Sequence, residues 1–225
     1  MAASFERLLS TRTKNGLLVI VVLIGIYLVL NFVIGRIIGG FLGSYVLPSL
    51  LWGILALAIY YLLPRGRPEA RLRHQKMLNW AAFLSALALI VAVYGVGLLQ
   101  GYSKSPYDQS FRGVIINIFY LGSMLAGMEL SRAWLINFLF KKKPGVGIVI
   151  MGLLFSFFAF SPRRLLSFET TLDGAEFTGG TFLPALSENL LASYLAFLGG
   201  ALPAIIYRGT LLACRWFVPI LPNLN

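Results

Sequence analysis

Five polar residues lie inside stretches of the chain that are otherwise apolar. Glu129 and Arg132 are three residues apart within the apolar run 113–143, so on a helix their side chains share one face. Glu188, Asn189 and Arg208 belong to a later apolar run. An unpaired charge within hydrocarbon is costly, so an ionisable residue there indicates either a functional site or an ion pair that locks helices together. We take these five residues as the candidate intramembrane polar site, with both interpretations open.

The loop that precedes this run has the spacing of a serine nucleophile loop. Residues 101–106 read G-Y-S-K-S-P, which matches the pattern G-x-S-x-x-P of Ser/Lys signal peptidases. A serine hydroxyl attacks poorly without a deprotonated lysine beside it. Lys104 directly follows Ser103, so in an extended loop the two side chains point apart. No β-rich region follows to form a substrate groove, and we therefore expect an ordinary loop here.

Other catalytic or metal-binding patterns are not found in the sequence. It has no H-E-x-x-H, G-x-S-x-G or P-loop motif and no paired aspartates within an apolar run. The lone Cys214 excludes an internal disulfide and a multi-cysteine metal site. We expect no catalytic residue, no metal and no cofactor in this chain.

The composition is that of a membrane protein. The chain has 225 residues, of which 58% are hydrophobic and 12% charged, and its mean hydropathy is +0.82. A soluble domain carries about twice that share of charge. The apolar runs are continuous and do not alternate with polar residues, which excludes a transmembrane barrel. The sequence predicts an all-α, polytopic transmembrane helical bundle in the cell membrane, with the lipid bilayer as its main partner.

The expected organisation is a polar tail over 1–15 followed by one transmembrane domain over 16–222. About six spans are expected, near 16–34, 47–63, 77–99, 113–140, 146–160 and 182–207. Gly199, Gly200 and Pro203 interrupt the last of these, which predicts a kink or break there. Residues 210–222 are too short to span and predict an interfacial segment. The stretch 161–180 fits an interfacial helix or an ordered loop.

Basic residues set the expected orientation. The net charge of +11 is concentrated in short loops and not in a basic patch interleaved with aromatic residues, so nucleic-acid binding is not expected. The tail, the loop 65–76 and the loop 141–143 carry eleven Lys and Arg, against five in the other three loops. Cytoplasmic loops carry the excess of such residues. We therefore predict a cytoplasmic N-terminus.

Two segments, 101–139 and 187–225, resemble the multi-span N-terminal region of certain bacterial signal peptidase I-like proteins, and the likeness extends over most of the chain from Leu47 onward. The resemblance implies that a membrane bundle precedes an external, β-rich Ser/Lys protease domain, reached by a further outward-crossing helix after Asn225. It carries no catalytic residue onto this chain. Any serine endopeptidase activity would depend on a dyad outside it.

The first functional hypothesis follows from that resemblance. The chain would anchor and position a signal peptidase I-like protein in the processing of exported proteins, with signal sequences or a protease domain as partners, and would not be catalytic by itself. One alternative is a small transporter or channel subunit that uses Glu129, Arg132 and Glu188. Another is a structural subunit of a membrane complex, packed through Gly35, Gly39 and Gly43, which recur every fourth residue.

Overall fold

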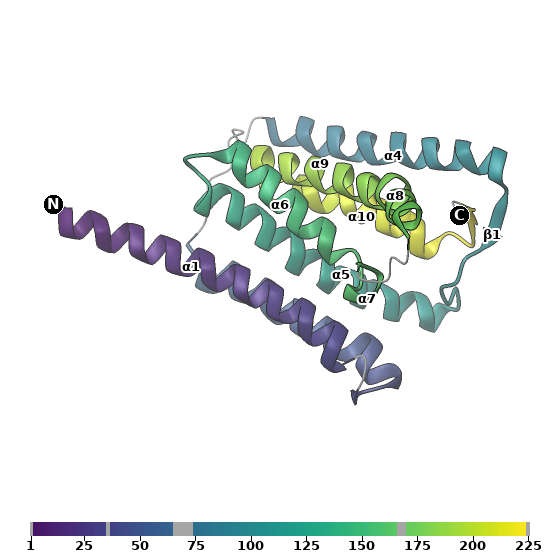
Figure 1. Cartoon of the computed structure of the whole chain (residues 1–225), viewed down its shortest axis with the longest axis horizontal. Coiled ribbons are helices and arrows are strands. Elements are labelled where there is room, and N and C mark those ends of the chain that lie inside the picture. The colour runs from purple at the N-terminus through teal and green to yellow at the C-terminus, as the bar shows by residue number, and fades with distance from the viewer. Residues whose placement is uncertain (1, 35–36, 65–73, 166–169, 224–225) are drawn as a thin grey trace.

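A computed structural model describes residues 2–34, 37–64, 74–165 and 170–223, with side chains from Thr13 onward. Within these residues the regular secondary structure is helical apart from two strands of three residues each (Figure 1). The helical elements, with η for a π-helical segment, are α1 (Ala2–Leu28), η1 (Val29–Ile34), η2 (Leu42–Val46), α3 (Leu47–Leu62), α4 (Gln75–Gln100), α5 (Phe111–Trp134), η4 (Leu135–Leu139), α6 (Pro144–Phe158), α7 (Pro162–Leu165), α8 (Thr171–Phe177), η5 (Thr178–Phe182), α9 (Leu183–Gly199) and α10 (Ala201–Phe217). The strands are β1 (Tyr102–Lys104) and β2 (Ile220–Pro222).

Five continuous helices are long and apolar enough to cross a membrane. They are Thr13–Ile34, Leu42–Leu62, Gln75–Gln100, Phe111–Leu139 and Thr171–Gly199. The helix Pro144–Phe158 is apolar but shorter. Only 17% of the most apolar window of Gln75–Gln100 is buried inside the protein, so most of that apolar surface needs lipid around it. The predicted all-helical membrane bundle is confirmed at this level, with five long apolar helices among the described residues.

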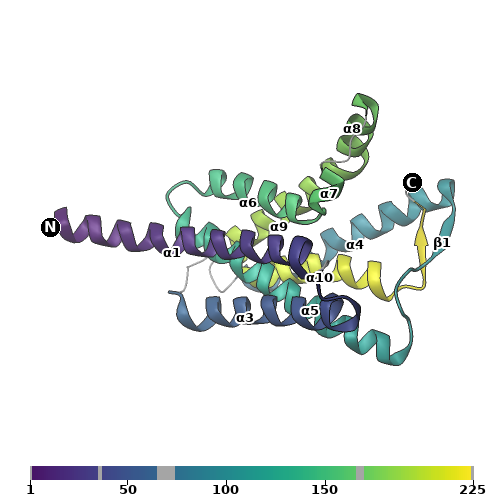
Figure 2. The same ribbon diagram turned by 60° about the horizontal axis from the view of Figure 1, so that its bottom comes forward.

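The long helices lie side by side and alternate in direction between two ends of the bundle (Figures 1 and 2). The end with residues 141–143 and Gly200 is called the lysine end, and here the Gln75 side chain donates to the Gly199 carbonyl (3.0 Å). The opposite end is called the strand end, because β1 and β2 pair there in antiparallel register. At the strand end the Tyr27 hydroxyl also donates to the Phe160 carbonyl (2.8 Å).

The expected single span over 182–207 is wrong, because the chain reverses at Gly200. The predicted break is present there: Gly200 has φ +76° and ψ −159°, a conformation open essentially only to glycine. Beyond it α10 runs antiparallel to α9, back toward the strand end (Figure 1). Pro203 is tolerated because it lies in the first turn of α10, where backbone N–H groups lack helical partners in any case. The reversal makes α9 and α10 two helices of 17 residues each.

Three other predicted stretches have the following structure. Residues 210–217 are the end of α10 and residues 220–222 form β2, so 210–222 is not one separate segment. Helix α1 begins at Ala2, so the expected tail is helical, since nothing in 2–15 breaks a helix. The stretch 161–180 contains α7 and α8, and α8 begins at a capping box between Thr170 and Asp173. Residues 166–169 and most of the loop 65–76 (65–73) lie outside the described part of the chain.

Of the glycines in the proposed packing ridge, Gly39 lies outside the helices and Gly43 lies in η2. Gly40, next to Gly39, has φ +73°. A Cβ at Gly39 would have nothing within 4 Å, and a Cβ at Gly43 would collide with the Ile38 carbonyl. Gly35 lies outside the described residues. The described members therefore give no surface for close helix packing.

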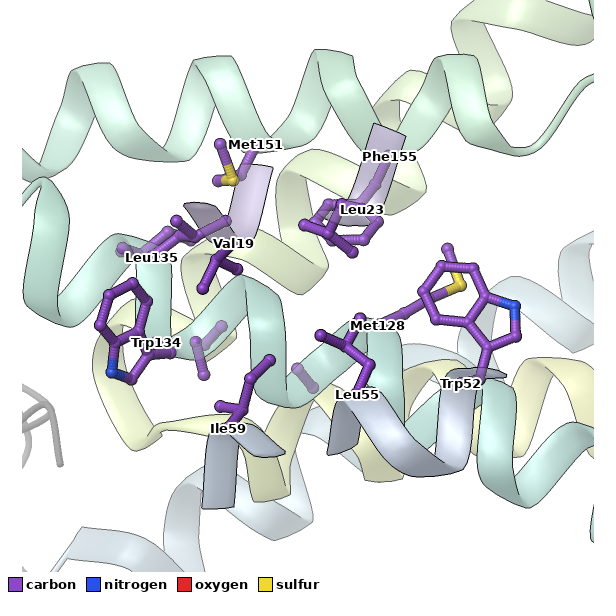
Figure 3. Close-up of a cluster of buried hydrophobic side chains, with 14 of the residues drawn as sticks. Val19, Leu23, Trp52, Leu55, Ile59, Met128, Trp134, Leu135, Met151 and Phe155 are labelled. Atoms are coloured by element: carbon purple, nitrogen blue, oxygen red, sulfur yellow. The ribbon is translucent and has the colours of Figure 1, made fainter. Parts of the chain in front are cut away.

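The main apolar core lies between α1, α3, α5 and α6 (Figure 3). Val19 and Leu23 of α1, Trp52, Leu55 and Ile59 of α3, Met128 and Trp134 of α5, and Met151 and Phe155 of α6 fill it. Helices α3 and α5 approach closely at Gly127, where an added Cβ would lie 2.7 Å from the Trp52 carbonyl oxygen. This close pair of helices carries Arg132 of α5 one turn beyond Met128.

We expect the Gly200→Ala substitution to destabilise the bundle by about 1–3 kcal/mol, because alanine is strained at this positive φ. Thermal unfolding of the detergent-solubilised chain measures the effect. The matched control is Gly95→Ala in the exposed part of α4, where an added Cβ meets nothing within 4 Å; it should be neutral or slightly stabilising. Equal unfolding temperatures for the two variants would contradict the assignment of Gly200 as the reversal point.

Candidate functional site

The five polar residues identified in the sequence lie together inside the bundle. Glu129 and Arg132 belong to α5, Glu188 and Asn189 to α9, and Arg208 to α10. Glu129, Arg132 and Asn189 are at most 1% exposed, and the Arg208 side chain is 12% exposed. They form two neighbouring groups, one centred on Arg132 and the other on Glu188.

The first group, the Arg132 cluster, consists of Arg132, Glu129, Asn189, Ser193 and Phe155. The Arg132 Nη1 donates to the Asn189 carbonyl (2.8 Å) and to the Ser193 hydroxyl (3.1 Å), and its Nη2 donates to the Asn189 Oδ1 (2.8 Å). Its Nε lies 3.0 Å from the Glu129 Oε2, an ion pair without the alignment of a hydrogen bond. The guanidinium also lies over the Phe155 ring, 4.3 Å from its centroid. One side chain therefore joins α5, α9 and α6.

Neighbouring amides extend this connection between α5 and α9. Asn137 Nδ2 donates to the Ala133 carbonyl (3.0 Å) and, across the interface, to the Ala196 carbonyl (2.8 Å). Asn189 Nδ2 donates to the Ala185 carbonyl within its own helix (2.9 Å). The Oδ1 of Asn189 and the hydroxyl of Ser193 accept hydrogen bonds from Arg132. This buried network, in which both Nη atoms of Arg132 are hydrogen-bonded and its Nε is ion-paired with Glu129, has the properties of a helix lock.

The second group, the Glu188 cluster, joins α9 to α10. The Glu188 Oε2 accepts from the Arg208 Nη1 (3.2 Å), and its Oε1 accepts a short hydrogen bond from Arg215. Arg208 and Arg215 are seven residues apart, so they project from one face of α10. Arg208 lies at the middle of the helix, whereas the Arg215 side chain is 53% exposed near the strand end.

Arg215 belongs to this cluster but is not among the five candidate residues predicted from the sequence. It was assigned to an interfacial segment because α10 was not recognised as a helix. The seven-residue spacing from Arg208 was the available signal. Ser193 and Asn137 were also missed; Ser193 lies one helical turn after Asn189, on the same face.

A cavity of about 480 Å³ opens beside the Glu188 cluster. Arg208 and Arg215 line it from α10, and Tyr27 and Asn31 line it from α1 and η1. Its remaining walls come from η2, α3, α5 and the end of α6. Glu129 and Arg132 are not among its lining residues, so the two groups differ: one is packed shut and the other borders open space.

The charges at this cavity do not balance. Two guanidinium groups share the single carboxylate of Glu188, while the charges of Arg132 and Glu129 cancel. The buried Nε of Arg208 has no hydrogen-bond partner among the described residues. The Glu188 cluster therefore carries one net positive charge and an unused donor.

The serine–lysine pair of the loop 101–106 shows no catalytic arrangement. Ser103 and Lys104 are adjacent and exposed on β1, where successive side chains point to opposite faces. Within residues 2–34, 37–64, 74–165 and 170–223, no three His, Cys, Asp or Glu side chains are grouped to hold a metal ion.

Comparisons with protein-family models, with curated proteins and with solved structures find no match for this chain.

Proposed function

We propose that this chain is the membrane-embedded anchoring and positioning region of a signal peptidase I-like protein. The observation that carries the proposal is the way the end of the described chain is held. After α10 the chain is fixed against the loop between α4 and α5, at the strand end of the bundle. A domain attached there would have a defined height and orientation relative to the bilayer.

Main-chain hydrogen bonds fix this terminal segment. Tyr102, Ser103 and Lys104 of β1 pair with Pro222, Leu221 and Ile220 of β2. The Ser105 N–H donates to the Pro219 carbonyl (2.9 Å), and the Asn223 N–H donates to the Gly101 carbonyl (3.0 Å). These bonds extend the two short strands at both ends.

Side chains from α4 and the loop complete the clamp. The Tyr94 hydroxyl donates to the Ile220 carbonyl (2.9 Å), and Gln109 Nε2 donates to the Trp216 carbonyl (3.0 Å). The Tyr107 ring stacks on Trp216 with centroids 3.9 Å apart. The loop itself is ordered at the start of α5, where the Ser110 N–H donates to the Asp108 carboxylate (2.8 Å) and thereby lowers the pKa of that carboxyl.

The Arg132 cluster supports the same role, because a positioning device must be rigid. Helix α9 precedes α10, and α9 is locked to α5 and α6 through the contacts of Arg132. The position of β2 along the bundle axis is therefore fixed relative to several helices and not to α10 alone.

The distribution of lysines and arginines sets the orientation in this proposal. With the lysine end in the cytosol, β2 would lie on the outer face, where signal sequences are cut. In this proposal α10 is the helix that crosses outward to the protease domain, in place of the further helix after Asn225 that the resemblance implied. The catalytic serine and lysine would belong to the protease domain and not to this bundle.

Alkaline phosphatase fusions test the orientation. The enzyme requires disulfides and is active only outside the reducing cytosol. A fusion after Asn223 is expected to be active in a bacterial host, and a fusion after Lys143 inactive. A fluorescent protein that matures in the cytosol should give the opposite pattern. An inactive Asn223 fusion, with an active Lys143 fusion, would overturn the proposed topology.

The coding sequence downstream of Asn225 tests the link to a protease. We expect an S-M-x-P loop followed by a later lysine in a β-rich region. A stop codon directly after Asn225 would remove the support for this reading.

The transporter alternative receives less support from the geometry. It requires Glu129 and Arg132 to face a substrate path, yet both side chains are buried, and Arg132 is held by contacts with α9 and α6. Reconstituted protein carrying Glu129→Gln would decide: a flux that this change abolishes would favour transport over positioning.

A further inference from the structure

The cavity beside the Glu188 cluster has a charge that its own walls do not neutralise. Two arginines face one carboxylate, and the unused Nε of Arg208 is buried. The excess positive charge is partly exposed, because the Arg215 side chain is 53% exposed whereas that of Arg208 is 12% exposed. An anion beside the two guanidinium groups would balance this charge.

The shape and lining of the cavity limit what that anion can be. The volume of about 480 Å³ is far larger than a monatomic ion needs. Its lining includes the polar side chains of Tyr27, Asn31 and Ser44 in addition to the two arginines. It also includes the apolar side chains of Leu30, Met124, Met128 and Phe158. In Figure 3, Met128 and Trp52, which also line the cavity, lie together at the edge of the apolar core.

The two arginines lie at different depths. Arg215 is near the strand end, and Arg208 is two turns further along the same helix face, about 10 Å deeper. A ligand that contacts both arginines has its charged group between the middle of α10 and the strand end of the bundle. An acyl chain attached to it would extend along the apolar lining.

We propose that this cavity binds a phosphate group, held by Arg208 and Arg215, with a membrane phospholipid as its source. Guanidinium groups bind phosphate oxygens with paired, charge-assisted hydrogen bonds. The Nε of Arg208 and the amide and hydroxyl groups of Asn31 and Ser44 supply further polar contacts. The apolar part of the lining favours a lipid over free phosphate. This proposal does not depend on whether a protease domain follows the strand end.

Binding is measured on the purified full chain after delipidation in detergent. Three probes are added separately: phosphatidylglycerol, diacylglycerol without a phosphate, and inorganic phosphate. Native mass spectrometry counts bound lipid and, over a lipid titration, gives the affinity. We expect phosphatidylglycerol to bind and diacylglycerol not to bind. Saturable binding of inorganic phosphate with the same arginine dependence would support the phosphate site and assign its source to the free ion.

Arginine variants test where the phosphate binds. Arg208→Gln is expected to weaken phosphatidylglycerol binding about tenfold or more, because a charge-assisted hydrogen bond is lost. The control is Arg112→Gln, an exposed arginine at the same end of the bundle, which should leave the affinity unchanged. If Arg208→Gln does not fold, Arg215→Gln replaces it, because the Arg215 side chain is half-exposed; the same loss of affinity for phosphatidylglycerol is expected. Equal affinities in Arg112→Gln and either cavity variant would overturn the proposal, as would binding of diacylglycerol as tight as that of phosphatidylglycerol.

Discussion

Replacement of Arg132 by methionine is expected to lower the free energy of unfolding of the bundle by about 3–5 kcal/mol. The change leaves Glu129 buried without its cation. It also leaves the Oδ1 of Asn189 and the hydroxyl of Ser193 without the donor that Arg132 supplies, and the Asn189 carbonyl keeps only its helical donor. A buried acceptor that loses its donor contributes its full desolvation penalty. Unfolding of the detergent-solubilised chain, followed by tryptophan fluorescence against denaturant, measures the loss.

Two further variants separate the charge from the geometry. Arg132→Lys keeps the positive charge but loses the planar fork that reaches Asn189 and Ser193 together, so an intermediate loss is expected. Combining Arg132→Met with Glu129→Gln removes the unpaired carboxylate and should restore part of the stability, a non-additive result. A loss below about 1 kcal/mol for Arg132→Met, no larger than typical exposed ion pairs give, would show that the cluster is not a lock.

The same variants address the two interpretations that the sequence left open for Glu129 and Arg132. A lock predicts that each single variant lowers the stability, Arg132→Met more than Arg132→Lys. A transport site predicts that Glu129→Gln abolishes flux in a protein that is still folded. The packing of Arg132 against Phe155 at 4.3 Å favours the lock.

Local spacing was sufficient to predict the Glu129–Arg132 pair, since residues three apart on a helix are neighbours whatever the fold around them. The partner helix could not be predicted in this way. Asn189 lies 57 residues further along the chain, and apolar runs give the lengths of helices without telling which helices pack together. The meeting of the five candidate residues therefore required the three-dimensional arrangement.

The error at the last predicted span has a physical cause. Residues 182–207 are apolar enough and long enough to cross a bilayer, so hydropathy alone reads them as one helix. Gly200 signalled a break but not its direction, because a glycine allows a kink as readily as a reversal. The reversal is set by packing: Glu188 meets Arg208 and Arg215, and α10 packs against α4, α5 and α9.

Replacement of Glu188 by glutamine is the second change with a large expected effect. It removes the carboxylate that both Arg208 and Arg215 contact, and Arg208 is then left almost fully buried without a counterion. We expect a loss of about 3 kcal/mol in the free energy of unfolding, at the lower end for a broken buried pair, because the half-exposed Arg215 regains water. Denaturant unfolding of the delipidated chain measures it.

The Glu188→Gln variant also links stability to the proposed phosphate site. In the native protein the Glu188 carboxylate competes with an added anion for the same two guanidinium groups. Once it is neutral, phosphatidylglycerol should bind more tightly, and it should raise the unfolding temperature of the variant by more than it raises that of the native chain. The double variant Glu188→Gln, Arg208→Gln should show neither the tighter binding nor the extra stabilisation. An equal shift in all three proteins would place the lipid elsewhere on the bundle, because a ligand that does not contact these arginines has no reason to respond to their counterion.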